Sequence, residues 1–207
     1  MNKTKIFKFL YEHIHTVIMA TTDDDGKPVT CAIDIMDFDA DGLYFLTAKG
    51  KSLYSRLKTR PYVALTGIKG ESTMTRIAVS VRGAVRECDR QKLLLLLEKN
   101  PYMYEIYPTG VSRKNLTAFI LYRGSGEWFS LSKKPIERFA FSFGETVMPN
   151  GRYVITEKCI GCGKCLAVCP QSCIEAETLP ASILQEHCLH CGNCFSVCPQ
   201  KAIIKEG

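Results

Sequence analysis

Nine of the eleven cysteines lie between residues 159 and 198. This segment repeats itself with an offset of 29 residues, and each half has the spacing C-x2-C-x2-C-x3-C-P. The repeated cysteines are Cys159, Cys162, Cys165 and Cys169 in the first half, and Cys188, Cys191, Cys194 and Cys198 in the second. In a reducing compartment, such a concentration of thiols indicates metal binding rather than disulfide formation.

The spacing suits an iron–sulfur cubane better than a single ion. Three thiolates placed two residues apart allow one tight loop to wrap three irons, and the neighbouring glycines permit close approach of the backbone. The fourth cysteine follows on a helical turn that points away, so it serves the other cluster. Paired zinc sites are the alternative, but zinc takes four ligands, usually in CxxC pairs, which leaves the third cysteine and the Cys-Pro unexplained. The segment is too short to fold on an apolar core alone, so we expect folding to depend on its metal.

With these motifs, residues 152–207 resemble a bacterial two-cluster ferredoxin, including the strand Tyr153-Val154-Ile155 before the first cysteine. The resemblance implies two [4Fe–4S] clusters, one held by Cys159, Cys162, Cys165 and Cys198, and the other by Cys188, Cys191, Cys194 and Cys169. Cys173 falls where the repeat has Ala202, so we expect a small buried side chain rather than a ligand. Cys31 and Cys88 lie in strand patterns, and we expect buried free thiols there.

Composition and charge narrow the function classes. The chain has 207 residues, of which 46% are hydrophobic and 23% are charged, as in a globular protein. The longest apolar run, residues 93–97, is too short to span a membrane. No secretory signal is visible at residues 1–5, so we expect a cytoplasmic protein. The formal charge of +6 comes with no more than two basic residues in a row, which argues against nucleic-acid binding.

The rest of the chain predicts mainly β structure with flanking helices. We expect strands at 17–21, 28–38, 43–47, 62–68, 75–87, 116–122 and 127–131, and helices at 3–15, at 52–58 and from Asp89 to before Pro101. Asp-Gly turns join the first strands. This order predicts an antiparallel barrel over residues 1–131, a connector at 132–151 and a small α+β ferredoxin-like domain at 152–207.

The segment 46–52 lies between a predicted strand and a predicted helix. Its hydroxyl groups, its lysines and the N–H groups at the helix start can bind a phosphate; a plain solvated loop is the alternative. The segment's candidate phosphate ligands are Thr47, Lys49, Lys51 and Ser52.

The order of these features resembles the pyridoxamine 5′-phosphate oxidase-like family of FMN-binding split β-barrels, over about residues 5–130. The matching features are the first Asp-Gly turn, Lys27-Pro28, the strand 41–47, Lys51 and the segment 60–65. The resemblance implies that FMN phosphate is held by the four residues named above, and that Thr30, Cys31 and Ala32 lie along the isoalloxazine. It also implies a homodimer with FMN at the subunit interface. Deazaflavin is the less favoured alternative, because related split barrels bind it.

One departure from that family bears on the substrate. The C-terminal segment with Arg and Trp, through which pyridoxamine phosphate oxidases hold their substrate, has no match in this sequence. We therefore do not expect vitamin metabolism, and no catalytic side chain is assigned. The expected function is a flavin and iron–sulfur oxidoreductase that passes electrons between the clusters and FMN. A low-potential redox protein and a small organic acceptor would be its partners. The alternatives are an electron carrier or adapter without a substrate, and a redox sensor.

Overall fold

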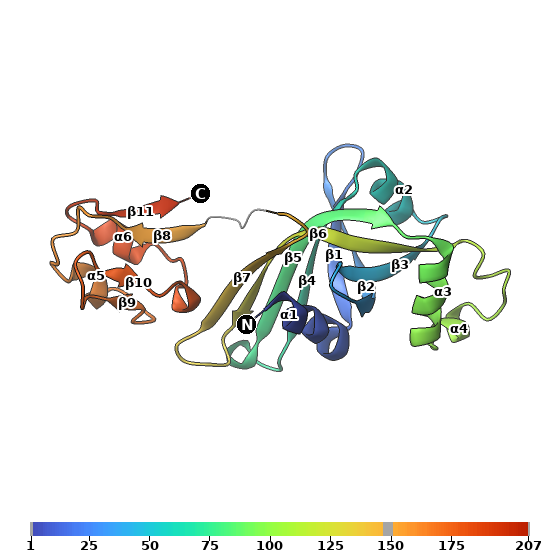
Figure 1. Ribbon diagram of the computed structural model, residues 1–207, viewed down its shortest axis with the longest axis horizontal. Helices are drawn as coiled ribbons and strands as arrows, with labels where there is room; N and C mark the ends of the chain where they lie inside the picture. Colours follow the sequence, from blue (N-terminus) through green and yellow to red (C-terminus); the bar gives the residue numbers. More distant parts are fainter. Residues whose placement is uncertain (1, 147–150, 207) are drawn as a thin grey trace. The chain divides into compact units, whose positions relative to one another are not determined.

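The computed structural model describes residues 2–146 and 151–206. Its contacts divide the chain into two compact units. The first comprises Met1–Lys69, Ala78–Glu127 and the chain from Phe141. The second comprises Gly70–Ile77, Trp128–Ala140 and the cysteine-rich C-terminal segment. Figure 1 labels the helices and strands of both units.

A seven-stranded sheet with the order β3-β2-β1-β4-β5-β6-β7 dominates the structure (Figure 1). An additional pairing of β3 with β6 closes the first six strands into a barrel, so the predicted antiparallel barrel is confirmed. The strands are β1 (Thr16–Thr22), β2 (Pro28–Phe38), β3 (Leu43–Ala48), β4 (Tyr62–Lys69), β5 (Ile77–Glu87), β6 (Leu116–Ser130) and β7 (Glu137–Phe143).

Short acidic turns connect the first strands, as the sequence predicts. Asp23 Oδ1 accepts hydrogen bonds from the N–H groups of Asp25 and Lys27, at 3.1 and 2.8 Å. In the next turn, Gly42 allows the backbone to approach β6 closely. A Cβ atom at this position would lie 2.1 Å from the carbonyl oxygen of Leu121, so the barrel closure requires glycine here.

Helices pack around the barrel. They are α1 (Lys3–Phe9), α2 (Ser52–Thr59), α3 (Arg90–Lys99) and α4 (Met103–Ile106). Helix α3 begins after Asp89, whose side chain accepts a hydrogen bond from the N–H of Lys92 at 2.8 Å. Its buried face packs on the outer side of the sheet, in a cluster that joins Leu93, Leu96 and Leu97 to Met36, Leu46 and Ile120. The five-leucine run 93–97 is therefore an amphipathic segment rather than a wholly buried one, since Leu94 and Leu95 are exposed.

The ends of three predicted elements differ in the structure. The helix predicted at 3–15 is α-helical only to Phe9 and continues as a π-helix over Leu10–Ile14, where the N–H of His15 bonds to Leu10 O at 2.7 Å. The strands predicted at 116–122 and 127–131 form one strand, β6. The segment predicted as the connector 132–151 contains β7, while residues 147–150 lie outside the described part of the chain.

The cysteine-rich segment folds around two small sheets and two short helices. Strand β8 (Arg152–Ile155) pairs with β11 (Ile203–Glu206), and β9 (Ile174–Glu175) pairs with β10 (Ser182–Ile183). The helices are α5 (Lys164–Ala167) and α6 (Asn193–Val197), and a short 3-10 turn lies at Gln185–His187. A second 3-10 turn, Thr73–Thr75, lies outside this segment, between β4 and β5. The core of this segment is small and joins Ile155, Ile174 and Ile203 to the cysteines.

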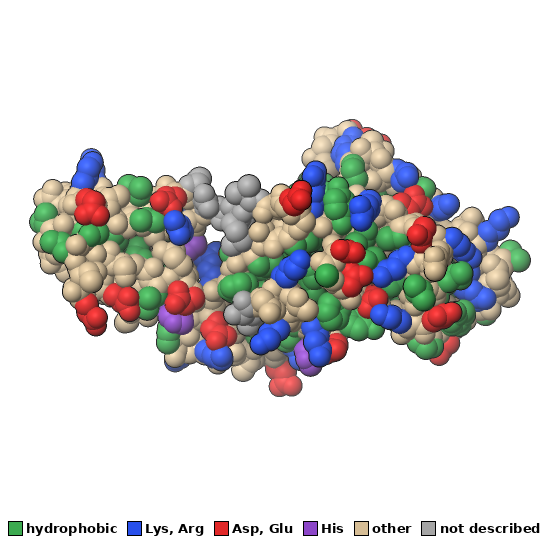
Figure 2. All heavy atoms as spheres, in the orientation of Figure 1, with side chains coloured by type: hydrophobic (Ala, Val, Ile, Leu, Met, Phe, Trp, Pro, Cys, Tyr) green, Lys and Arg blue, Asp and Glu red, His purple; other side chains and the backbone are tan. Residues whose placement is uncertain are grey.

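Two surface properties bear on function. No helix within the described residues is long and apolar enough to cross a membrane. On the face drawn in Figure 2, hydrophobic side chains lie among Lys, Arg, Asp and Glu side chains, and neither sign of charge takes over a continuous stripe.

Candidate functional site

The eight repeated cysteines lie around two cavities in the C-terminal segment. Cavity 1 has a volume of about 270 Å³ and cavity 2 about 20 Å³. The cysteines that line cavity 1 are Cys159, Cys162, Cys165 and Cys198. Those that line cavity 2 are Cys169, Cys173, Cys188, Cys191 and Cys194. Each half of the repeat thus sends its fourth cysteine to the cavity of the other half, as the ferredoxin resemblance implies.

Two tight loops position the first three cysteines of each set. Gly163 and Gly192 precede α5 and α6 with φ angles of 71° and 80°, a left-handed conformation that favours glycine. A side chain at Gly192 would also meet the hydroxyl of Tyr153 at 2.9 Å. The loops turn sharply because of these glycines, so the cysteines on either side face one cavity.

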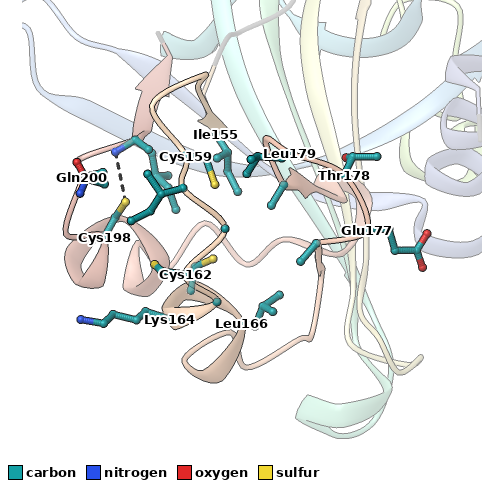
Figure 3. A pocket seen from close by; sticks show the side chains of 18 residues that line it. Ile155, Cys159, Cys162, Lys164, Leu166, Glu177, Thr178, Leu179, Cys198 and Gln200 are labelled. Atoms are coloured by element: carbon teal, nitrogen blue, oxygen red, sulfur yellow. Dashed lines mark hydrogen bonds between the residues drawn. The ribbon is translucent and has the colours of Figure 1, made fainter.

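The fourth cysteine of each half is held by the same backbone geometry. The N–H of Cys173 donates to Cys169 Sγ at 3.4 Å, and the N–H of Ala202 donates to Cys198 Sγ at 3.3 Å. The second of these bonds is drawn dashed in Figure 3. Each of these two sulfurs therefore accepts a backbone hydrogen bond at the corresponding position of the repeat.

The cysteines around cavity 1 leave room for a group larger than a single ion. Four thiolates on one zinc ion lie about 3.8 Å apart, since each Zn–S bond is about 2.3 Å. The cavity 1 cysteines instead surround an open volume that is walled by Ile155 and Leu179 (Figure 3). Ile203 also lines this volume, which suits a larger inorganic group.

Cys173 is buried, as its sequence position predicts, and its Sγ lies 3.5 Å from Cys169 Sγ. It is therefore a fifth cysteine beside cavity 2, in contact with a candidate ligand. Cys31 and Cys88 are only half-buried. Burial raises the pKa of Cys88 to about 11, so this thiol is protonated at neutral pH.

The three candidate isoalloxazine residues on β2 do not share one face. Cys31 lies opposite the fully buried Met19, on the inner side of the sheet. Thr30 and Ala32 lie opposite Ala20 and Ile18 and are exposed on the outer side. A flat ring along this strand can therefore contact either Cys31 or the Thr30–Ala32 face, because neighbouring strand residues point to opposite sides.

Cys31 is close to α2, which brings part of the predicted site together. Burial raises the pKa of the Cys31 thiol, while the positive charges of Arg56 and Lys51 act to lower it. Arg56 Nε also donates a hydrogen bond of 2.8 Å to Thr21 Oγ1. Strands β1 and β2 and helix α2 thus converge at one place. Arg56 is a residue that the sequence reasoning missed, although it follows Ser52 by one helical turn and shares its helix face.

The predicted phosphate-binding segment, residues 46–52, has polar groups that can bind an anion. Thr47 is buried, and its Oγ1 has no hydrogen-bond partner among the described residues. Lys49, Lys51 and Ser52 are exposed, and no side chain caps the start of α2. Since a buried hydroxyl without a partner is costly, Thr47 is a ready donor for an anion at this helix start. The loop residues therefore fit the phosphate end of a flavin nucleotide.

A carboxylate lies near the same loop. Glu87 Oε1 accepts a hydrogen bond from Thr117 Oγ1 at 2.7 Å, and Thr117 pairs with Thr47 in the sheet. Its other oxygen is 3.0 Å from Lys58 Nζ. Burial acts to raise the pKa of Glu87, but the Thr117 hydroxyl and the Lys58 ammonium outweigh it, so the pKa lies below its usual range. Lys58 is consequently occupied by Glu87 and is a weaker candidate for an anion than Lys51.

Comparison with known proteins agrees with this arrangement. Residues 4–120 match the family model described as pyridoxamine 5′-phosphate oxidase, and residues 158–202 match the model of a 4Fe-4S dicluster domain. No curated protein matches the chain in sequence.

Several solved structures share the barrel. One is a NimC/NimA family protein from Clostridium acetobutylicum, with 20% identity, a TM-score of 0.55, and coverage of 67% of this chain and 91% of that one. Another, from the same organism, is related to general stress protein 26 of the pyridoxinephosphate oxidase family, with 19% identity, a TM-score of 0.52, and coverage of 66% and 95%. A heme binding protein from Mycobacterium smegmatis has 8% identity, a TM-score of 0.52, and coverage of 66% and 56%. At these identities the likeness concerns the fold alone. Since the barrel model covers more than half of the 207 residues, the chain belongs to the pyridoxamine 5′-phosphate oxidase family and carries a 4Fe-4S dicluster domain after the barrel.

Proposed function

We propose that this protein is an oxidoreductase that passes electrons between two [4Fe–4S] clusters and FMN, and between FMN and a small organic molecule. The observation that carries the proposal is the separation of the cysteines into two sets around two cavities, in a chain whose barrel belongs to a flavin-binding family. Clusters move single electrons, whereas a flavin takes one or two, so their combination in one chain suits collection of an electron pair.

The two cavities support the ligand sets that we propose. One cluster would be held by Cys159, Cys162, Cys165 and Cys198, and the other by Cys188, Cys191, Cys194 and Cys169. The N–H groups of Cys173 and Ala202 would each donate a hydrogen bond to one of these sulfurs. The chain's own contribution is to fix the sulfur positions and to set the potentials through such bonds and through burial.

The barrel would hold FMN through its phosphate. Thr47, Lys49, Lys51 and Ser52 would bind the phosphate, and we add Arg56, which lies beside Cys31 and so links the loop to β2. Arginine is well suited to this task, because its planar fork binds phosphate oxygens in pairs. The bound FMN would supply the electron exchange with the substrate.

We further propose that the barrel forms a homodimer through the outer face of β2, β1 and β4. This face exposes large apolar side chains, with Ile18, Tyr62 and Ile68 each more than half exposed. Ala20, Ala64 and Thr30 lie in register between the strands and make the face flat. A flat apolar surface of this kind is typical of a subunit interface.

Anaerobic purification with iron, sulfide and flavin analysis tests the proposal. About eight irons and one FMN per chain, with FMN reduced through the clusters, would support it. Eight irons without a flavin would contradict the oxidoreductase as stated. Reduction of FMN with no turnover of any small acceptor would favour the electron-carrier alternative. Sedimentation analysis of the same sample, with Ile18→Glu as the variant, tests the homodimer.

A further inference from the structure

The two cavities differ in the number of cysteines that line them. Cavity 1 is lined by four, which is the number of thiolates that a [4Fe–4S] cluster takes. Cavity 2 is lined by five, and the proposed function assigns no role to the fifth, Cys173. Its side chain is 3% exposed, and its Sγ lies 3.5 Å from the Sγ of Cys169, the proposed fourth ligand. A small side-chain movement would therefore bring the fifth sulfur to the position of the fourth.

Main-chain bonds fix the position of Cys173 without the side chain of Cys169. Cys173 immediately precedes β9, and its carbonyl oxygen accepts a hydrogen bond of 2.8 Å from the N–H of Leu184. Leu184 in turn follows β10, the strand that pairs with β9. Removal of the Cys169 sulfur leaves these bonds in place. We therefore expect the Cys173 thiol to stay beside cavity 2 in a chain that lacks Cys169.

The corresponding position in the other half has the same main-chain arrangement without a thiol. Ala202 immediately precedes β11, and its carbonyl oxygen accepts a hydrogen bond of 2.8 Å from the N–H of Thr156. Its N–H donates to Cys198 Sγ, as the N–H of Cys173 donates to Cys169 Sγ. Ala202 also lines cavity 1. The chain thus contains one site with a fifth thiol and a matched site without one.

We propose that Cys173 is a substitute ligand for the cluster at cavity 2, which binds iron when Cys169 does not. The proposal rests on the proposed function, because it concerns one of the same two clusters. One iron–Sγ bond, to Cys169, breaks, and one iron–Sγ bond, to Cys173, forms. The thiol proton of Cys173 passes to the departing Cys169 thiolate, or to solvent in a chain without Cys169. No electron is gained or lost, and the number of thiolate ligands stays at four.

The test measures whether each variant of the full chain holds both clusters after anaerobic reconstitution. The test variant is Cys169→Ala, and the matched control is Cys198→Ala, which removes the fourth ligand at cavity 1. Alanine is used because a serine hydroxyl can itself bind iron. Two further variants change the fifth position: Cys169→Ala with Cys173→Ala removes the thiol, and Cys198→Ala with Ala202→Cys supplies one. Iron and sulfide analysis and EPR of the reduced protein are the measurements.

We expect Cys169→Ala to keep about eight irons per chain and the EPR signals of two [4Fe–4S] clusters. The Cys198→Ala variant and the variant without Cys169 and Cys173 should each lose one of these signals, with iron falling to about four to seven per chain. Ala202→Cys should restore the signal that Cys198→Ala loses. Such a gain separates ligation from misfolding, because a misfolded chain does not regain a cluster.

Loss of a cluster in Cys169→Ala, to the same extent as in the variant that also lacks Cys173, would overturn the substitute ligand. Two intact clusters in that double variant would do the same, and so would failure of Ala202→Cys to restore the cluster. The proposed function fails in a different way. A wild-type chain with about eight irons and no flavin would contradict the oxidoreductase, and the comparison of the cysteine variants would still decide the role of Cys173.

Discussion

The Sγ atoms of Cys169 and Cys173 lie 3.5 Å apart, and the N–H of Cys173 donates to the same Cys169 sulfur. The other half of the repeat has this N–H contact between Ala202 and Cys198, but no second thiol. The backbone turn is also shared, because Ser172 and Lys201 have φ angles of 50° and 48°. The two cluster sites thus have one backbone geometry and differ at one side chain beside the fourth ligand.

This difference predicts the effect of Cys173→Ala. Loss of an S–H donor beside Cys169 should make the potential of the cluster at cavity 2 more negative, because the reduced cluster carries more negative charge. The expected change is about 20–40 mV, which corresponds to a hydrogen bond of about 0.5–1 kcal/mol for a one-electron couple. Redox titration followed by EPR measures it. The cluster at cavity 1 serves as the internal control, and an equal change in both clusters would contradict the interpretation.

The exchange of fourth ligands gives a second prediction. Cys169 follows Cys165 by four residues, yet it lines cavity 2. We therefore expect Cys169→Ser to give the spectrum and potential changes of Cys191→Ser, and not those of Cys165→Ser. Conversely, Cys198→Ser should resemble Cys162→Ser. EPR of the five reduced variants decides the grouping, and a grouping by position along the chain would disprove the assignment.

Arg56 allows a test of the flavin phosphate site. If it binds phosphate as proposed, Arg56→Gln should weaken FMN binding by about 10- to 100-fold, the range for loss of a charge-assisted hydrogen bond of about 1.5–3 kcal/mol. Fluorescence titration of the flavin-free protein measures the dissociation constant. Arg60→Gln is the matched control, because Arg60 forms a salt bridge to the exposed Asp24 instead. Equal weakening by the two variants would argue against a specific role for Arg56.

Cys88 provides a pH-dependent prediction. Burial raises its pKa from 9.0 to about 11, so the folded state favours the neutral thiol. At pH 9, we expect alkylation by iodoacetamide about fifty-fold slower in the folded protein than in the unfolded chain, because only the thiolate reacts. The stabilisation from this thiol is complete below its unfolded pKa and is lost as the pH rises through about 11. Peptide mass spectrometry measures the rate at this residue, and equal rates in the folded and unfolded chains would refute the prediction.

The first strands of the barrel were predictable because the turns between them depend on residues that are neighbours in the sequence. Asp23 and Gly26 mark the first hairpin, and Asp39 and Gly42 the second, and each turn forms where the sequence places it. The single strand β6 was not predictable in this way. We predicted two strands, at 116–122 and 127–131, and Gly124 lies between them. In the structure Gly124 lies against Gly83, and a Cβ there would come within 2.1 Å of Arg82 O. A glycine required for close contact between distant strands looks the same in the sequence as a glycine in a turn.

The candidate site also has features that the local sequence predicts and features that depend on tertiary packing. The cysteine spacing predicted two sets of four cysteines, and in the structure each set lines one cavity, with Cys173 as a fifth cysteine at cavity 2. The alternation of β2 already implied that Cys31 faces away from Thr30 and Ala32, and period-two reasoning would have separated them. The position of Arg56 beside Cys31 depends on how α2 packs across the barrel strands. That information is tertiary, so no local pattern contains it.

The repeated backbone of the cysteine-rich segment has a consequence for the two clusters. Both are built on turns of the same shape, so a difference between their potentials would arise from the positions where the halves differ, such as Lys164 against Asn193 and Cys173 against Ala202, and from the burial of each set of cysteines. Exchanging these pairs one at a time between the halves would measure how much each pair contributes to the difference between the two potentials. In each such variant, the unchanged half of the repeat serves as the control for the changed half, because both belong to the same molecule.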